Sequence, residues 1–233
     1  MCEYVKISGW LKTSFIDYPG TVSTVLFLSG CNLRCPFCHN PGIVNDELPQ
    51  VAFDEVKQYL IKRKHIVEGV VISGGEPTLH PSLPELVREL KNMKLRVKID
   101  TNGLLPEMIE KTSPDYLALD IKTVPEKYRL LGADMVDVQC RLRKSISMVE
   151  AMGENGEVRI PVVPGLVDDF EIEELKELLG GVRKVFIQPF KRNAELLDPA
   201  FSDIEPHSPE KLKGWCRMLR SLSIDCHIRG MEY

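Results

Sequence analysis

The chain has 233 residues, and 30 lysines and arginines against 34 aspartates and glutamates give it a net charge of −4. That length can bury a full core in one large domain, and the slightly acidic balance argues against a nucleic-acid-binding protein, which needs a basic face. No apolar run approaches the roughly 18 residues of a membrane span, and the first residues show no signal-peptide pattern, so we expect no membrane contact and a cytoplasmic location. In a reducing compartment, the seven cysteines favour metal binding over disulfides.

Short apolar runs, nearly continuous in hydrophobicity, predict parallel strands that are covered on both faces. They lie at Val22–Leu28, Val70–Ser73, Val97–Asp100, Tyr116–Ile121, Val158–Val163 and Val185–Gln188. Helical spacing of apolar residues between and after them predicts helices over Phe53–Leu60, Leu83–Leu90, Ile172–Leu179 and Leu212–Leu219. Ser82 and Glu85 have the spacing of a capping box, and Ser208-Pro209 predicts the start of the last helix.

About six strand–helix units in this order predict an α/β fold with a parallel sheet and right-handed crossovers. A closed eight-fold barrel typically takes about 250 residues, so the shorter chain favours a partial (β/α)6-type TIM-like barrel. We expect a single domain over residues 1–233.

Polar side chains gather where the predicted strands end, which is where folds of this kind carry their chemistry. In chain order these residues are Cys31, then Gly74, Gly75 and Glu76, then Asp100 and Thr101, then Asp120 and Lys122, with Arg159 inside the next strand. A sheet used only as a scaffold has no reason to gather polar residues at one end.

The loop directly after the first predicted strand contains Cys31, Cys35 and Cys38 in a C-x3-C-x2-C arrangement. A structural zinc site would add His39 as the fourth ligand, although adjacent Cys38 and His39 have difficulty reaching one small ion. The run Cys35-Pro-Phe-Cys38-His39 also has the form of a c-type haem attachment box, which normally belongs to exported proteins. The third interpretation is an iron–sulfur cluster held by three thiolates, with one iron left open for a ligand.

On this cysteine loop, over residues 30–42, the chain resembles the radical S-adenosylmethionine (SAM) enzymes. The resemblance implies a radical SAM core and one [4Fe–4S] cluster on Cys31, Cys35 and Cys38, whose open iron is chelated by SAM. It also implies that one electron from the cluster cleaves SAM to methionine and a 5′-deoxyadenosyl radical.

Two further motifs are similar to those of the glycyl radical enzyme activating proteins: the D-x-P-G stretch Asp17–Gly20 and the run Cys38-His39-Asn40. The wider run Gly9–Gly20 resembles most closely the activating protein of the anaerobic ribonucleoside-triphosphate reductase. The resemblance implies a glycyl radical enzyme as partner, with anaerobic ribonucleotide reductase favoured and pyruvate formate-lyase or another glycyl radical enzyme as the alternative. It also implies an electron donor such as flavodoxin or ferredoxin. A small-molecule radical SAM enzyme and a zinc-binding module without activity stay open as alternatives.

The resemblance assigns SAM contacts to residues at two strand ends. Gly74, Gly75 and Glu76 match the family's G-G-E turn, whose backbone contacts the SAM amino group; an ordinary strand-to-helix turn is the simpler account. Asp100 and Thr101 match the D-T-N-G motif, where they help to hold a monovalent cation beside the SAM carboxylate, a role that suits oxygen ligands.

The remaining assignments lie at other strand ends. Asp120 and Lys122 match an L-D-x-K strand end that contacts SAM, with a mutual ion pair as the simpler account. Arg159 matches an arginine on the ribose side of SAM, or forms a structural salt bridge. Asp17 matches a residue near the partner's glycine loop, or forms a turn before Pro19. Lys191 stands where a relative has a histidine near the adenine, so the resemblance leaves adenine recognition open.

Overall fold

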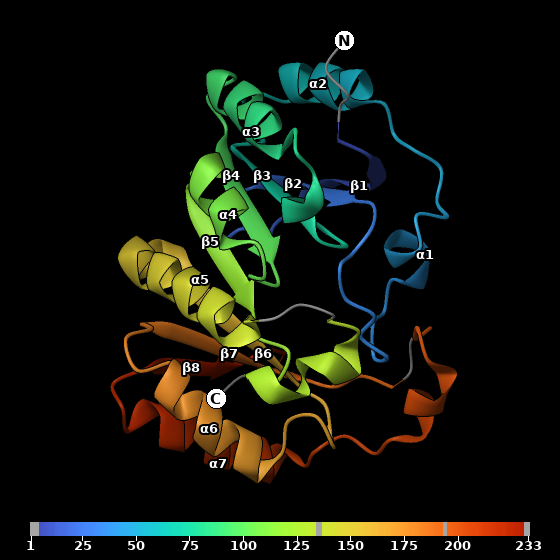
Figure 1. Cartoon of the computed structure of the whole chain (residues 1–233). Coiled ribbons are helices and arrows are strands. Elements are labelled where there is room, and N and C mark those ends of the chain that lie inside the picture. The colour runs from blue at the N-terminus through green and yellow to red at the C-terminus, as the bar shows by residue number, and fades with distance from the viewer. Residues whose placement is uncertain (1–4, 134–136, 193–194, 231–233) are drawn as a thin grey trace. The chain divides into compact units, whose positions relative to one another are not determined.

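A computed structural model describes residues 5–133, 137–192 and 195–230, which form two compact units (Figure 1). The first unit comprises Met1–Asn32, Asn40–Thr101 and Glu107–Leu117, and the second comprises Leu33–His39, Asn102–Pro106 and Ala118–Tyr233. Residues 1–4, which contribute to the signal-peptide prediction, lie outside the described part. Within the described ranges, no helix is long and apolar enough to cross a membrane.

The first unit is built on strands that lie side by side in chain order. They are β1 (Ile7–Ser14), β2 (Ser23–Leu28), β3 (Gly69–Gly74), β4 (Arg96–Thr101) and the first two residues of β5 (Tyr116–Asp120). Its helices are α1 (Pro41–Val44), α2 (Phe53–Lys62), the short 3-10 helix η1 (Pro77–Leu79), α3 (Leu83–Asn92) and most of α4 (Pro106–Thr112). β1 is antiparallel to β2, whereas β2, β3 and β4 run parallel.

The second unit continues with the end of β5 and three more strands, β6 (Gly156–Val162), β7 (Lys184–Pro189) and β8 (Asp225–Ile228). These last three strands run parallel in chain order. Its helices are η2 (Pro125–Leu131), α5 (Val138–Met152), η3 (Gly153–Asn155), α6 (Asp169–Leu178), η4 (Pro199–Asp203) and α7 (Pro209–Arg220). α5 packs on β6 and α7 packs on β8 (Figure 1).

All six predicted strands are confirmed, with ends that differ by no more than two residues. They were predictable because they are apolar throughout: Val70, Val71 and Ile72 of β3, for example, have no exposed surface. Two strands were missed. β1 mixes buried and exposed side chains and is antiparallel, so the sheet is parallel-dominated rather than wholly parallel. β8 has only four residues, which is too short to show a periodicity.

The helix predictions were confirmed except for one cap. Ser82 precedes α3, but its side chain makes no capping hydrogen bond, because its backbone (φ −85°, ψ 3°) lacks the extended shape of a capping residue. The capping box stands instead at α6, between Asp168 and Glu171. Ser208 accepts a hydrogen bond from the Lys211 amide and starts α7 as predicted. Of the α-helices in the described residues, α1, α4 and α5 were not predicted, and neither were the short 3-10 helices η1 to η4.

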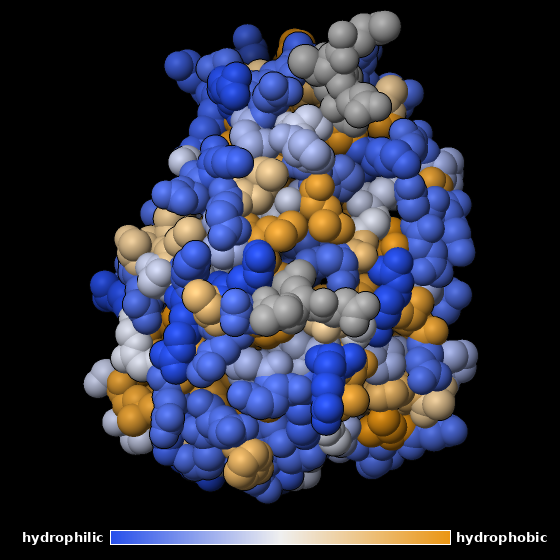
Figure 2. Space-filling view, viewed as in Figure 1, coloured by the Kyte–Doolittle hydropathy of each residue, from blue (hydrophilic) through white to orange (hydrophobic). Residues whose placement is uncertain are grey.

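The apolar side chains form the core of each unit and leave the surface to polar ones. In the first unit Tyr18, Val25, Val71 and Tyr116 pack together, with Phe27 against them. In the second unit Cys216 is 1% exposed, as expected for a small core residue. Figure 2 shows hydrophilic side chains over most of the visible face, with hydrophobic ones scattered among them, which is usual for a folded protein.

Candidate active site

The cysteine loop leaves β2 and carries Cys31 in the first unit and both Cys35 and Cys38 in the second. None of the three thiols is in a disulfide. In the second unit, segments distant in the sequence hold the loop backbone: the Arg34 amide donates to the Leu131 carbonyl at 2.6 Å, and the Leu197 amide donates to the Cys38 carbonyl at 3.0 Å. The thiols therefore stand on a backbone that is fixed by hydrogen bonds.

The glycine turn at the end of β3 packs backbone to backbone on the start of the cysteine loop. The Gly75 amide donates to the Leu28 carbonyl at 2.9 Å, and the Glu76 amide donates to the Gly30 carbonyl at 2.8 Å. A Cβ on Gly75 would stand 1.9 Å from the Gly30 oxygen, and one on Gly74, whose φ is +116°, would stand 2.4 Å from the Leu28 nitrogen. Only residues without a side chain allow this approach.

Glu76 joins the glycine turn to the end of β4. Its carboxylate is 1% exposed and accepts hydrogen bonds from the Thr78 amide at 3.0 Å, from the Thr78 hydroxyl at 2.5 Å and from the Thr101 hydroxyl at 2.7 Å. These donors satisfy a buried carboxylate that would otherwise be costly. The structure thus brings Glu76 and Thr101 together, two residues that were predicted separately.

Asp100 and Asp17 meet at a buried lysine that the sequence analysis missed. The Lys98 side chain is 1% exposed, and its Nζ lies 2.9 Å from Asp100 Oδ1. The same ammonium donates to the Asp17 carbonyl at 2.7 Å. The Asp17 carboxylate in turn accepts a hydrogen bond from the Ser14 hydroxyl at 2.5 Å. The D-x-P-G stretch is therefore attached to β4 through Lys98.

In the second unit, Asp120, Lys122 and Arg159 form one ion-pair network. Arg159 Nε donates to Asp120 Oδ1 at 2.5 Å, and Lys122 Nζ donates to Asp120 Oδ2 at 2.8 Å. Burial raises the pKa of Asp120, but the Arg159 and Lys122 charges outweigh it and hold that pKa well below its usual range. The simpler accounts that the sequence left open are both present: Lys122 forms an ion pair with Asp120, and Arg159 forms a salt bridge with Asp120.

Cys35 interacts electrostatically with Lys122 of this ion-pair network. Burial lowers the pKa of Lys122, but Asp120 and the Cys35 thiolate together raise it above its usual value. The Lys122 amide also donates to the Tyr128 hydroxyl at 3.0 Å. Tyr128 is fully buried, and burial is the main cause that raises the pKa of its phenol well above the usual range. A positive charge thus stands beside one of the three loop cysteines.

The residues that sequence analysis missed are Lys98, Thr78 and Tyr128. A charged residue inside an otherwise apolar strand was the available signal for Lys98, since a lysine is almost never fully buried unless it is paired. Thr78 follows Glu76 by two residues and offers only a hydroxyl, and Tyr128 lies in a short 3-10 helix, so neither carried a sequence signal.

His39 and Lys191 are in contact in the second unit. The His39 ring forms a hydrogen bond with the Lys191 backbone, and burial, followed by the Lys191 charge, lowers the pKa of His39 below its usual value. Among the residues that the structure describes, no group of three or more histidines, cysteines, aspartates and glutamates is placed to hold a single metal ion.

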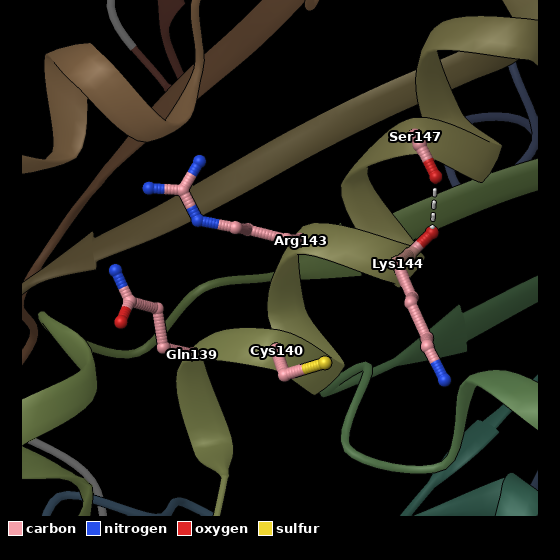
Figure 3. Close-up of a pocket in the computed structure, with 5 residues that line it drawn as sticks. All are labelled: Gln139, Cys140, Arg143, Lys144 and Ser147. Carbon is pink, nitrogen blue, oxygen red and sulfur yellow. Dashed lines mark hydrogen bonds between the residues drawn. The ribbon is translucent and has the colours of Figure 1, made fainter.

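Two of the surface hollows formed by the described residues are lined from the second unit, and the predicted site residues are not among their lining residues. One, of about 460 Å³, is lined from a single helix, α5, by Gln139, Cys140, Arg143, Lys144 and Ser147 (Figure 3). There the Ser147 hydroxyl donates to the Lys144 carbonyl at 2.7 Å, an ordinary helix contact. The other, of about 430 Å³, is lined by Arg34, Pro36, Leu130, Leu166, Leu197, Asp198 and Phe201. The cysteine loop borders the second hollow.

Comparison with known proteins agrees with this arrangement. The family model of the radical SAM superfamily matches residues 25–179. A Methanocaldococcus jannaschii protein, provisionally named as a glycyl-radical enzyme activating enzyme, is 33% identical over 79% of this chain and 80% of its own length. The pyruvate formate-lyase-activating enzyme of Clostridium pasteurianum is 30% identical over 93% of this chain and 98% of its own length. The crystal structure of QueE from Escherichia coli shares the fold, with a TM-score of 0.61 at 16% identity, and the match covers 97% of this chain and 93% of QueE.

The chain therefore belongs to the radical SAM superfamily, and its fold is the α/β fold of that superfamily, with a parallel-dominated sheet. Among its relatives in that superfamily are glycyl-radical enzyme activating enzymes, so the protein is a radical SAM enzyme. Family membership implies a [4Fe–4S] cluster and SAM as cofactors.

The residues present fit these cofactors. None of the three loop cysteines is in a disulfide, and cysteine thiolates are the ligands that hold iron–sulfur clusters. The Cys35 thiolate is one of the charges that raise the pKa of Lys122, so a positive charge is available in the second unit to interact with a cluster bound at Cys35. The turn at Gly74 and Gly75 approaches the loop so closely that a Cβ on either residue would meet backbone atoms.

Proposed function

We propose that this protein is an activating enzyme that installs a glycyl radical on a partner enzyme. The observation that carries the proposal is the C-x3-C-x2-C loop with the Gly74–Glu76 turn packed on its first residues. The names of the relatives support the same activity. When bound, the cluster and SAM supply the 5′-deoxyadenosyl radical that removes a hydrogen atom from a glycine of the partner.

The chain's own residues would bind and orient these groups. Cys31, Cys35 and Cys38 would each hold one iron of the cluster. The backbone of Gly74, Gly75 and Glu76 would contact the SAM amino group, and Thr101, which is hydrogen-bonded to Glu76, would stay in a fixed rotamer beside it.

Within the second unit, Asp120, Lys122 and Arg159 would also contact SAM. Arg159 and Lys122 hold the Asp120 carboxylate ionised, so a polar cofactor would meet side chains whose charge and position are already set. Two cations around one carboxylate leave a net positive charge there, which suits the carboxylate of SAM and an anionic cluster.

The segment before Asp17 supports a protein partner. Phe15 and Ile16 are 76% and 83% exposed, and two neighbouring large apolar side chains at a loop are typical of a surface that meets another protein. We therefore propose that Asp17 lies near the glycine loop of the partner. Anaerobic ribonucleotide reductase stays the favoured partner on the Gly9–Gly20 resemblance, whereas the names of several relatives support pyruvate formate-lyase. Flavodoxin or ferredoxin as electron donor, a single domain and a cytoplasmic location also stay predictions.

Electron paramagnetic resonance on an anaerobic mixture tests the proposal. The mixture contains the reconstituted protein, a reductant, SAM and, in separate samples, the ribonucleotide reductase or the pyruvate formate-lyase of the same organism. A glycyl doublet on one of them, lost when its glycine is replaced, would establish the activity and name the partner. If 5′-deoxyadenosine forms without a doublet on either, the protein cleaves SAM but activates neither of these partners, which leaves another glycyl radical enzyme or a small molecule as its substrate.

A matched pair of cysteine variants tests the cluster loop. Cys35→Ala removes a buried thiol of the loop, and Cys140→Ala removes an exposed thiol on α5. We expect Cys35→Ala to lose the iron and sulfide of the cluster and all SAM cleavage, and Cys140→Ala to keep both. Full cleavage by Cys35→Ala would refute the assignment, and one zinc without sulfide in the unaltered protein would favour the zinc module.

A further inference from the structure

The ammonium group of Lys98 is buried among a carboxylate, a backbone carbonyl and an aromatic ring. Lys98 and Asp100 are two residues apart in β4, so their side chains lie on the same face of the strand. Nζ lies 2.9 Å from Asp100 Oδ1, 2.7 Å from the Asp17 carbonyl oxygen and 5.7 Å from the centre of the Tyr116 ring. An ammonium group that is 1% exposed needs partners of this kind, because an unpaired buried charge is costly.

These partners are also those of a monovalent metal ion. A carboxylate oxygen and a backbone carbonyl oxygen are the hard ligands that an alkali cation prefers, and the face of an aromatic ring attracts cations in general. The Lys98 ammonium carries the same single positive charge, and it already stands at Asp100, where the family resemblance places the metal ion.

We propose that Lys98 replaces the monovalent metal ion in this protein, so that its ammonium supplies the positive charge at Asp100 and no potassium or sodium ion binds there. A metal ion on Asp100 would stand next to the ammonium, and like charges repel strongly where little water screens them. The inference concerns the site of the proposed function, but it depends on neither the partner nor the activity.

A lysine differs from a metal ion in one respect that matters for the site. Its charge is attached to β4 and cannot be diluted away, so the link between Asp100 and the Asp17 backbone persists at any salt composition. Lys98 is then a positioning residue: it fixes the D-x-P-G stretch relative to the end of β4. The protein would work equally well in sodium, potassium or choline salts.

Thermal unfolding of the cluster-loaded protein at constant ionic strength tests the proposal without an activity assay. The salts are the chlorides of choline, sodium and potassium, and the variants are Lys98→Met, which keeps the length of the side chain but not its charge, and Lys98→Gln. The control is Lys57→Met, which removes a half-exposed lysine paired with Glu89 on the surface of the same unit.

We expect the melting temperature of the unaltered protein to differ by no more than about 1 °C among the three salts, and we expect the same of Lys57→Met. Lys98→Met or Lys98→Gln should melt lower in choline and recover by about 2–4 °C in potassium or sodium, because a metal ion then fills the vacated position. A stabilisation of the unaltered protein by potassium or sodium that Asp100→Asn removes would overturn the proposal. So would folded Lys98 variants that show no response to either cation. Neither result depends on whether a glycyl radical forms.

Discussion

The replacement of Gly75 by alanine is the sharpest test of the contact between the glycine turn and the cysteine loop. The new Cβ would stand 1.9 Å from the Gly30 carbonyl oxygen, whereas real Cβ contacts essentially never fall below 3.0 Å. The neighbouring atoms are backbone, so no side chain can rotate away. The carbonyl must retreat by about 1 Å, and that same oxygen accepts the Glu76 amide hydrogen bond at 2.8 Å.

The cost has two parts. Overpacking typically costs about 1–3 kcal/mol, and a buried hydrogen bond that is stretched or lost costs about 1–3 kcal/mol more. We therefore expect Gly75→Ala to lower the free energy of unfolding by about 3 kcal/mol and the melting temperature by roughly 6–12 °C. Since Gly30 precedes Cys31, the displaced loop should also hold less iron after reconstitution.

Gly214→Ala is the matched control, because it is the same chemical change in helix α7, where a Cβ would meet nothing within 4 Å. Alanine is favoured over glycine inside a helix by about 0.5–1 kcal/mol, so this variant should be slightly more stable than the unaltered protein. Urea unfolding and iron analysis of both variants are the measurements. If Gly75→Ala unfolds at the same urea concentration as the unaltered protein and binds the same amount of iron, the reasoning from this contact is refuted.

Three further predictions concern buried polar groups. Burial, followed by the Asp115 carboxylate, raises the pKa of Tyr18 to about 12, so the stability that its neutral phenol contributes is present below pH 10 and is lost as the pH rises toward 12. Urea unfolding between pH 9 and pH 12 should show this loss for the unaltered protein and not for Tyr18→Phe. If the free energy of unfolding falls with pH in the same way for both proteins, the prediction is contradicted. Arg159→Met removes a partner of Asp120 and should lower the free energy of unfolding by about 2–3 kcal/mol at pH 7. Because the lowered pKa of Asp120 stabilises the fold above pH 4, this loss should shrink below pH 4 in urea unfolding. A loss that does not change with pH would refute the pairing. Glu76→Met removes the oxygen that accepts hydrogen bonds from the Thr78 amide, the Thr78 hydroxyl and the Thr101 hydroxyl, so thermal melting should show a loss of about 1–3 kcal/mol, and an unchanged melting temperature would argue against that network.

The interior strands and the cysteine loop were open to prediction because their signals are local. A short uninterrupted apolar run such as Val70–Ser73 is typical of a parallel strand that is covered on both faces, and the spacing of three cysteines within eight residues is visible without a structure. β1 escaped prediction because its polar and apolar residues do not keep a clean period of two. α5 was not predicted, although its buried Val138, Leu142, Ile146 and Val149 recur at helical spacing, so the signal was present in the sequence.

The sequence by itself determined the residue types, the order of the strands and the fact that polar side chains stand where those strands end. Only the tertiary structure decided which of these side chains meet: Glu76 with Thr101, Asp120 with Lys122 and Arg159, and Lys98 with both Asp100 and the Asp17 backbone. Periodicity reports one segment at a time, whereas the contact between Lys98 and Asp17 joins residues 81 positions apart. Such a contact depends on how separate segments pack around the sheet, and that packing has no local trace in the sequence.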